Sequence, residues 1–343
     1  MYRSWIGLVL LSAAAVRADP LSCASLKTLI DQTYGFRPSQ LDAAGRDRKS
    51  AQMDAVWSVV EANRSVLVPC LRSELIERTR DTWFEFDGSR LLERVDPSPE
   101  SRRMLLEALN RVAFEDVDLR NWVEIAASLG DAGLDTSSVG RLWLEAPRAE
   151  YWLPEHAAYH VDRENGALFI YGAADERFAT PALVELVRTT TGPERRIAVS
   201  LLMSQATPES LHALRDVNPA GLSAEEQGSL RALLDRPMLL EARKPPKATR
   251  EEYVKAFRSF LDGDEKPFRA LVEKVPDGER DVVAVCTAED IDLIRRVRRR
   301  MISSANQHAI EYYAVFSKIL MTMVWRAGPP AEDRAALEAG AGA

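Results

Sequence analysis

The sequence predicts an all-α protein built from stacked antiparallel helix pairs, preceded by a cleavable N-terminal signal peptide. Three observations support this prediction. Apolar residues recur at spacings of three and four along most of the chain, helix-capping residues mark many segment ends, and the connections are short. The strict alternation of a half-buried strand is nearly absent. With 343 residues, 46% of them hydrophobic, the chain is long enough for two ordinary domains or one extended helical array.

Composition excludes several classes of protein. Three cysteines are too few for a disulfide-dense scaffold or for a multi-cysteine zinc or iron–sulfur protein. The formal net charge is −7, whereas binding to nucleic acid requires a basic face that neutralises phosphates. We therefore expect no nucleic acid partner.

Residues 1–18 have the pattern of a signal peptide. Arg3 supplies a positive start, and residues 5–16 form an uncharged apolar run. Since that run is too short to cross a bilayer, an uncleaved anchor is the weaker alternative, and we expect no transmembrane segment in the mature chain. The stretch ends Val16-Arg17-Ala18, and the β-branched residue at −3 with alanine at −1 favours cleavage between Ala18 and Asp19. We expect a periplasmic or secreted protein.

Residues 19–150 are predicted to be an N-terminal helical region that holds two of the three cysteines. Cys23 and Cys70 are the candidate disulfide pair in an oxidising compartment, which leaves Cys286 unpaired. Because Cys286 follows an apolar run, we expect it to be a buried and unreactive thiol.

Aromatic residues concentrate between residues 83 and 152. Aromatic side chains often anchor protein interfaces, although core packing is the alternative for each of them singly. The candidate partner-binding residues in this stretch are Trp83, Phe84, Trp143 and Trp152.

Two histidines, His156 and His160, have the spacing that lets one helix face offer two metal ligands. Glu155, Asp162 or Glu164 could add a carboxylate ligand. The alternative is a histidine pair on the surface or in a groove, because a metal ion needs at least three ligands in a fixed geometry. We expect no cofactor.

The segment 179–188 recurs 27 residues later as 206–215, with Ala-Thr-Pro and the final arginine shared. Threonine caps the amide groups of a helix start, and proline suits the first helical position. We therefore predict helices that begin at Pro181 and Pro208, each followed by a second helix, 193–205 and 223–234. Over about residues 179–235 the chain resembles HEAT-type repeats of the short bacterial kind. The resemblance implies a right-handed α-solenoid in which successive repeats bury their faces against each other.

These patterns divide the rest of the chain into four segments. Residues 151–235 are assigned to HEAT-like repeats, 236–248 to a Pro-rich linker, 249–326 to a C-terminal helical block and 327–343 to a disordered tail. Within the block, Thr249 and Thr287 each precede an acidic residue by three positions, which is a capping-box pattern.

Two features of the C-terminal block have alternative interpretations. The run 295–300 contains five arginines, and a solvated helix face that complements the helix dipole is favoured over a phosphate or lipid site. Residues 305–325 form an unusually apolar helix, which indicates burial. The alternative is self-association through residues 305–326.

The sequence contains no nucleophile elbow, P-loop or dinucleotide-binding pattern. We therefore expect a protein-binding or scaffolding module in the bacterial envelope, without catalysis, whose partner is another protein. The alternative is an envelope hydrolase with a carboxylate or metal site near His156 and His160.

Overall fold

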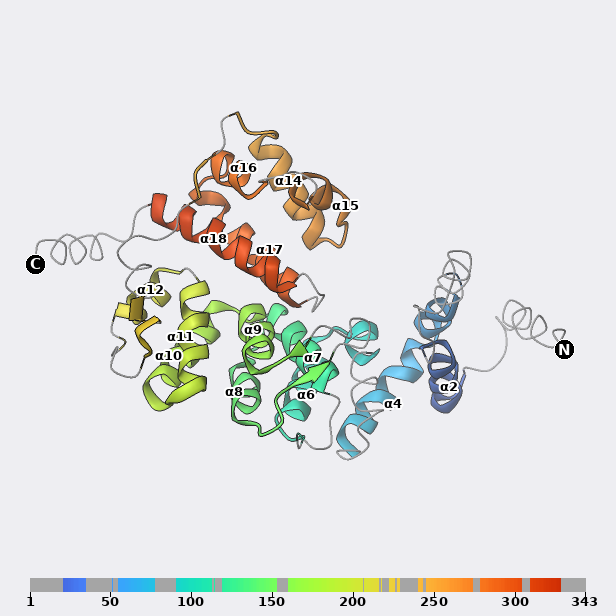
Figure 1. Ribbon diagram of the computed structural model, residues 1–343. Coiled ribbons are helices and arrows are strands. Elements are labelled where there is room, and N and C mark those ends of the chain that lie inside the picture. Colours follow the sequence, from blue (N-terminus) through green and yellow to red (C-terminus); the bar gives the residue numbers. More distant parts are fainter. Residues whose placement is uncertain are drawn as a thin grey trace, which may run out of the picture. The chain divides into compact units, whose positions relative to one another are not determined.

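The computed structural model describes a set of residues that are mostly helical (Figure 1). The described residues are 21–34, 51, 55–77, 91–112, 114, 119–152, 160–205, 207–215, 217, 222–225, 227–228, 240–242, 245–273, 278–303 and 309–327. The signal-peptide pattern at residues 1–18 lies outside them, as does the tail at 328–343. Among the helices described, none is both long enough and apolar enough to cross a bilayer. The chain divides into unit 1, residues 1–108, and unit 2, residues 109–343.

Unit 1 contains α2 (Cys23–Tyr34), α4 (Arg64–Glu77) and most of α6 (Pro99–Leu109). Leu26 of α2 and Leu67 of α4 are fully buried. The guanidinium of Arg72 donates to Asp96 at 2.7 Å and to Ser101 at 2.9 Å, which ties α4 to the start of α6. These contacts fix the entry of α6 because Asp96 also accepts from the Ser101 hydroxyl at 2.6 Å.

In the first half of unit 2, the third helix packs on the first and second, and the last three helices pack in succession. A two-residue antiparallel strand pair separates the third helix from the second. The helices are α7 (Leu119–Asp131), α8 (Ser137–Glu145), α9 (Arg163–Ala173), α10 (Glu176–Thr189), α11 (Gly192–Gln205) and α12 (Pro208–Arg215), and the strands are β1 (Tyr151–Trp152) and β2 (His160–Val161). Gly192, at φ +67°, makes the tight turn between α10 and α11 that other residues adopt only with strain.

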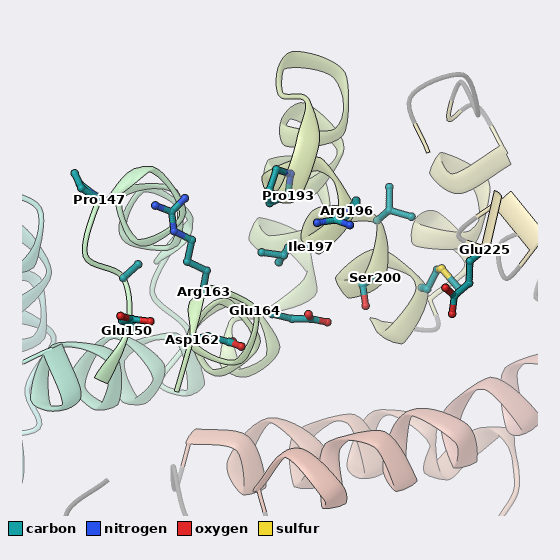
Figure 2. A pocket seen from close by; sticks show the side chains of 13 residues that line it. Pro147, Glu150, Asp162, Arg163, Glu164, Pro193, Arg196, Ile197, Ser200 and Glu225 are labelled. Atoms are coloured by element: carbon teal, nitrogen blue, oxygen red, sulfur yellow. The ribbon is translucent and has the colours of Figure 1, made fainter. Parts of the chain in front are cut away.

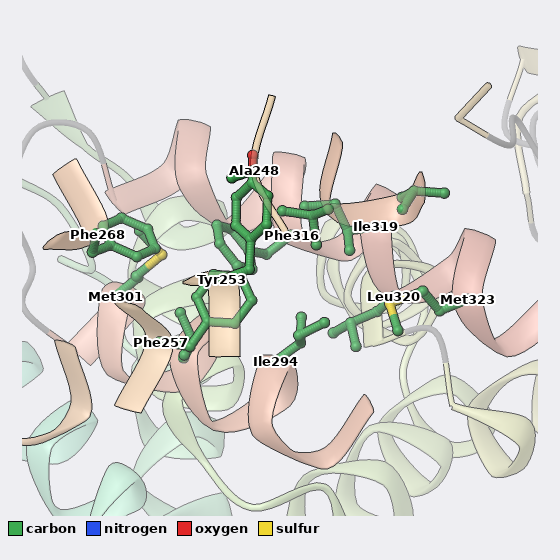
Figure 3. Close-up of a cluster of buried hydrophobic side chains, with 13 residues drawn as sticks. Ala248, Tyr253, Phe257, Phe268, Ile294, Met301, Phe316, Ile319, Leu320 and Met323 are labelled. Carbon is green, nitrogen blue, oxygen red and sulfur yellow. The ribbon is translucent and has the colours of Figure 1, made fainter. Parts of the chain in front are cut away.

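The second half of unit 2 has its own aromatic core, drawn in Figure 3. Phe257 contacts Phe268 and Phe316 with ring centroids 6.2 and 6.1 Å apart. The elements are α14 (Arg250–Leu261), α15 (Lys266–Phe268), the π-helical η4 (Arg269–Glu273), α16 (Gly278–Val285), the 3-10 helix η5 (Ala288–Asp290), α17 (Ile291–Ser303) and α18 (Ala309–Ala327).

The apolar helix predicted at residues 305–325 corresponds to α18 and is buried within its own chain. Phe316, Ile319 and Leu320 have no exposed surface. Leu240, from the predicted linker, packs against this core and donates its amide to the Thr322 hydroxyl at 2.9 Å. The prediction of burial is confirmed for these residues.

Helix α17 joins the two halves of unit 2, since it packs on α7 and α9 as well as on α14 and α18. Its buried Arg298 donates to the Ser204 carbonyl at 2.8 Å, the Gln205 carbonyl at 3.1 Å and Glu176 at 3.0 Å. Arg299 donates to the same Glu176 carboxylate at 2.7 Å. The prediction that this basic run forms a solvated face is therefore wrong for Arg298, which is buried, and for Arg299, which is half-buried, because both pair with Glu176 of α10.

The two Thr-Pro segments differ from each other. At the second, α12 begins at Pro208 and the Ser210 amide donates to the Thr207 hydroxyl at 3.0 Å, as predicted. At the first, α10 already begins at Glu176, with Asp175 as its cap, and Pro181 lies inside the helix. The predicted helix start at Pro181 is thus wrong. Thr180 is buried and donates to Gln205 at 2.7 Å instead.

The predicted capping boxes at Thr249 and Thr287 are confirmed. At the second, Asp290 accepts from the Thr287 amide at 2.8 Å and from two nitrogens of Arg250 at 2.7 and 2.8 Å. Burial by itself would raise the pKa of Asp290. The hydrogen bonds from Arg250 and Thr287, with the Arg250 charge, outweigh it and hold the pKa below its ordinary value.

Replacing Arg298 with alanine removes the group that joins α10, α11 and α18. We expect Arg298→Ala to lower the free energy of unfolding by about 3–5 kcal/mol, because the Glu176 carboxylate and two carbonyls lose their shared donor. The exposed Arg296 of the same helix is the matched control. Arg296→Ala should change the free energy of unfolding by less than about 0.5 kcal/mol. Urea unfolding followed by circular dichroism measures both, and equal effects would contradict the assignment.

Asp290 makes the stability of unit 2 sensitive to acid. A lowered pKa contributes stability that is present above the unfolded value of about 3.9 and is lost as pH falls through the folded pKa. We expect Asp290→Asn to lower the free energy of unfolding by about 1–3 kcal/mol at pH 7 and to show a shallower loss toward pH 2 than the wild type. The exposed Asp292 supplies the control, and Asp292→Asn should keep the wild-type pH dependence. Identical pH profiles for both variants would refute this role.

Candidate functional site

The candidate site is an open hollow of about 790 Å³ in unit 2, called the groove below (Figure 2). It lies beside the N-terminal ends of α9 and α11 and the segment that follows α8. Its lining residues are Pro147, Ala149, Glu150, Asp162, Arg163, Glu164, Pro193, Arg196, Ile197, Val199, Ser200, Met203 and Glu225.

The groove combines an apolar surface with exposed charges of mainly one sign. Glu150, Asp162, Glu164 and Glu225 are all exposed, and two arginines are present among the described lining residues. Figure 2 shows Glu150 and Asp162 at one end and Glu225 at the other. The carboxylates are therefore spread along the groove rather than gathered around one point.

Arg163 holds the walls of the groove together. Its guanidinium donates to the Leu144 carbonyl at 3.0 Å, the Ala146 carbonyl at 2.7 Å and the Glu194 carboxylate at 3.0 Å. The end of α8 and the first turn of α11 are thereby fixed to the first turn of α9. Asp162 caps α9 by accepting from the Asn165 amide at 3.0 Å. Both residues owe their positions to the start of α9.

Trp143 packs against the start of α9, which lines the groove. Its indole has no exposed surface, stacks near Trp122 with centroids 6.2 Å apart and donates to the Arg163 carbonyl at 3.0 Å. The indole fits against α9 because residue 166 is glycine, since a Cβ at that position would overlap the ring. Trp143 was predicted as a partner-binding residue, and the structure corrects this, since a fully buried ring offers no contact surface.

The metal-site hypothesis placed His156 and His160 on one helix face. His160 lies in β2, directly opposite Trp152 of β1, so the helical spacing does not apply to it. His156 lies outside the described residues, as do Trp83 and Phe84. Strand β2 leads directly into Asp162 at the groove wall.

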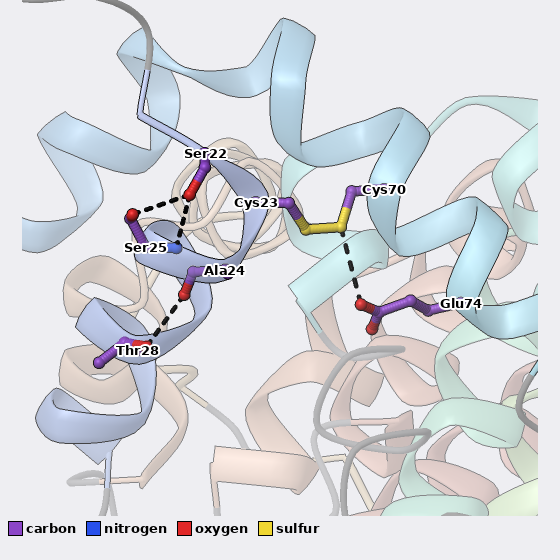
Figure 4. The surroundings of a disulfide bond; sticks show 7 residues. All are labelled: Ser22, Cys23, Ala24, Ser25, Thr28, Cys70 and Glu74. Atoms are coloured by element: carbon purple, nitrogen blue, oxygen red, sulfur yellow. Dashed lines mark hydrogen bonds between the residues drawn. A yellow bond between two sulfur atoms is a disulfide. The ribbon is translucent and has the colours of Figure 1, made fainter.

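The cysteines have distinct environments. Cys23 and Cys70 are joined by a disulfide with Cα atoms 6.3 Å apart, and Glu74 lies 3.8 Å from the Cys70 sulfur (Figure 4). These three are the cluster of potential metal ligands within the described residues, and the disulfide occupies both sulfurs. Cys286 is half-buried rather than fully buried as predicted, because it lies at the edge of the aromatic core. Its partial burial still raises the pKa of the thiol to about 12, which makes it unreactive at neutral pH.

Sequence reasoning missed the groove residues Arg163, Arg196 and Glu225. Charged residues are common in this chain, so none of these stands out singly. The usable signal was Asp162 followed three residues later by Asn165 before an apolar helix, which marks a capped helix start.

Gly166→Ala tests whether Trp143 sets the position of α9. Alanine favours a helix over glycine, but we expect overlap with the buried indole to dominate and to lower the free energy of unfolding by about 1–3 kcal/mol. Gly228 is the matched control, because it is helical and a Cβ there meets open space, so Gly228→Ala should be neutral or stabilising. Urea unfolding measures both variants, and a stabilised Gly166→Ala protein would contradict the packing argument.

Comparison of the chain with protein-family models, with curated proteins and with solved structures finds no match.

Proposed function

We propose that this chain is an exported HEAT-like helical-repeat protein that binds another protein in the bacterial envelope, with the groove as its binding surface. The observation that carries the proposal is the spread of exposed carboxylates along an open groove whose lining is part polar and part apolar. Charges placed on separate elements recognise an extended partner surface, whereas catalysis requires groups that converge on one reacting atom.

The packing of consecutive helices supports the repeat part of the proposal. α10 packs on α11 and α11 on α12, which is the packing between neighbours that stacked repeats would have. In a right-handed α-solenoid, such layers present a continuous surface made of equivalent helices. Arg163, by tying α9 to α11, keeps this surface rigid and lowers the cost of ordering it on binding.

The disulfide supports the export part of the proposal. Disulfides persist in oxidising compartments and are rare in the cytosol of mesophiles, and Cys23 and Cys70 are joined here. Together with the signal-peptide pattern at residues 1–18, this favours a periplasmic or secreted location.

The alternative function, an envelope hydrolase with a metal or carboxylate site near His156 and His160, is favoured by one observation. His160 lies two residues before Asp162, which lines the groove. Elemental analysis of the untagged protein distinguishes the two functions. Stoichiometric zinc that disappears in His160→Ala would favour the hydrolase, and its absence would leave the binding function as the better account.

The binding function is tested by neutralising the groove. We expect Glu150→Gln, Glu164→Gln and Glu225→Gln, combined in one protein, to weaken partner binding roughly tenfold, because charge-assisted contacts are lost. The measurement is cross-linking capture from an envelope extract with quantitative mass spectrometry. The matched control carries Glu185→Gln, Glu209→Gln and Glu251→Gln, exposed residues that do not line the groove. Partners retained equally by both variants would rule out the groove.

A further inference from the structure

A second cavity, of about 310 Å³, lies among α10, α11 and the region of α12. The described linings of this cavity and of the groove have no residue in common, and the two use different faces of α11. Its volume is near the lower end of the range of roughly 300–1,000 Å³ that holds small-molecule ligands.

The inner wall of this cavity is apolar. Val187, Leu202 and Val217 line it, and none of them is more than 9% exposed. A hollow with such a wall offers no hydrogen bonds to hold water in place, so an apolar group enters it favourably.

Two arginines are the charged residues among the described lining of the cavity. Arg188 lies in the last turn of α10 and Arg195 in the first turn of α11, so both belong to the end of the hairpin marked by Gly192. Among the residues that the structure describes, none that lines the cavity is acidic. The exposed guanidinium of Arg188 makes no ion pair or hydrogen bond with another side chain of the described residues. The cavity therefore has a cationic end and an apolar interior.

We propose that this cavity binds a single-chain carboxylate amphiphile of the medium-chain fatty acid type. The carboxylate lies at Arg188 and Arg195, because a guanidinium pairs with a carboxylate through two parallel hydrogen bonds. The alkyl chain lies against Val187, Leu202 and Val217. The small volume favours one chain over a two-chain lipid. This proposal does not rest on the proposed protein-binding groove, since the described linings of the two sites have no residue in common.

Calorimetric titration of the full chain with decanoate, kept below the concentration at which it forms micelles, tests the head group. We expect decanoate to bind with one site and decanol, which has the same chain without a charge, to bind roughly tenfold more weakly. Decyltrimethylammonium should not compete, because its charge is repelled by the two arginines. Equal affinity for decanoate and decanol would overturn the role of the arginines, and tighter binding of decyl phosphate would overturn the choice of a carboxylate.

Two variants locate the ligand. Arg188→Gln should weaken decanoate binding roughly tenfold and leave decanol binding unchanged, while its exposed position leaves the melting temperature as in the wild type. Ala213→Leu, which adds volume to the lining, should weaken both ligands. Arg141→Gln, an exposed arginine of α8 outside the cavity, is the charge-matched control and should bind like the wild type. Wild-type decanoate binding by Arg188→Gln, or by a folded Ala213→Leu protein, would refute the site.

Discussion

The buried guanidinium of Arg298 is the contact on which the arrangement of unit 2 depends. It satisfies the carbonyls of Ser204 and Gln205 at the end of α11 while pairing with Glu176 at the start of α10. A charge with 1% of its side chain exposed is tolerated only when acceptors surround it, and here they come from distant parts of the chain. Its geometry therefore specifies how α17 packs against the helices of the first half.

The use of arginine inside the molecule also explains the character of its surface. Arg163 at the groove and Arg298 in the core both donate to carbonyls at helix ends, and Arg299 is paired with Glu176. Part of the basic charge is thus committed to internal contacts. The carboxylates that line the groove remain exposed, so the groove is more acidic than the net charge of −7 alone would indicate.

Predictions from the sequence succeeded where the determining contacts are local. The caps at Thr207, Thr249 and Thr287 each need a partner three residues away, and all three are present. The start of α10 was mispredicted because Thr180 has a better partner in Gln205, which lies 25 residues away. Arg298, Trp143 and the groove depend on packing between separate helices, which no local pattern encodes. The part of the groove that a local pattern encodes is the start of α9, where Asp162 caps the helix by accepting from the Asn165 amide.

The contacts of α17 have a consequence for the order in which unit 2 folds. Arg298 meets its acceptors in α10 and α11 across separations of 93 to 122 residues, and Arg300 meets Asp131 across 169. Contacts this distant form late, because a long loop must close before they contribute. Helices α7 to α12 therefore leave the ribosome before the helix that joins them exists. The surfaces of α7 and α9 that pack on α17 stay uncovered until nearly the whole chain has been synthesised, and in that interval a holding chaperone would be most useful.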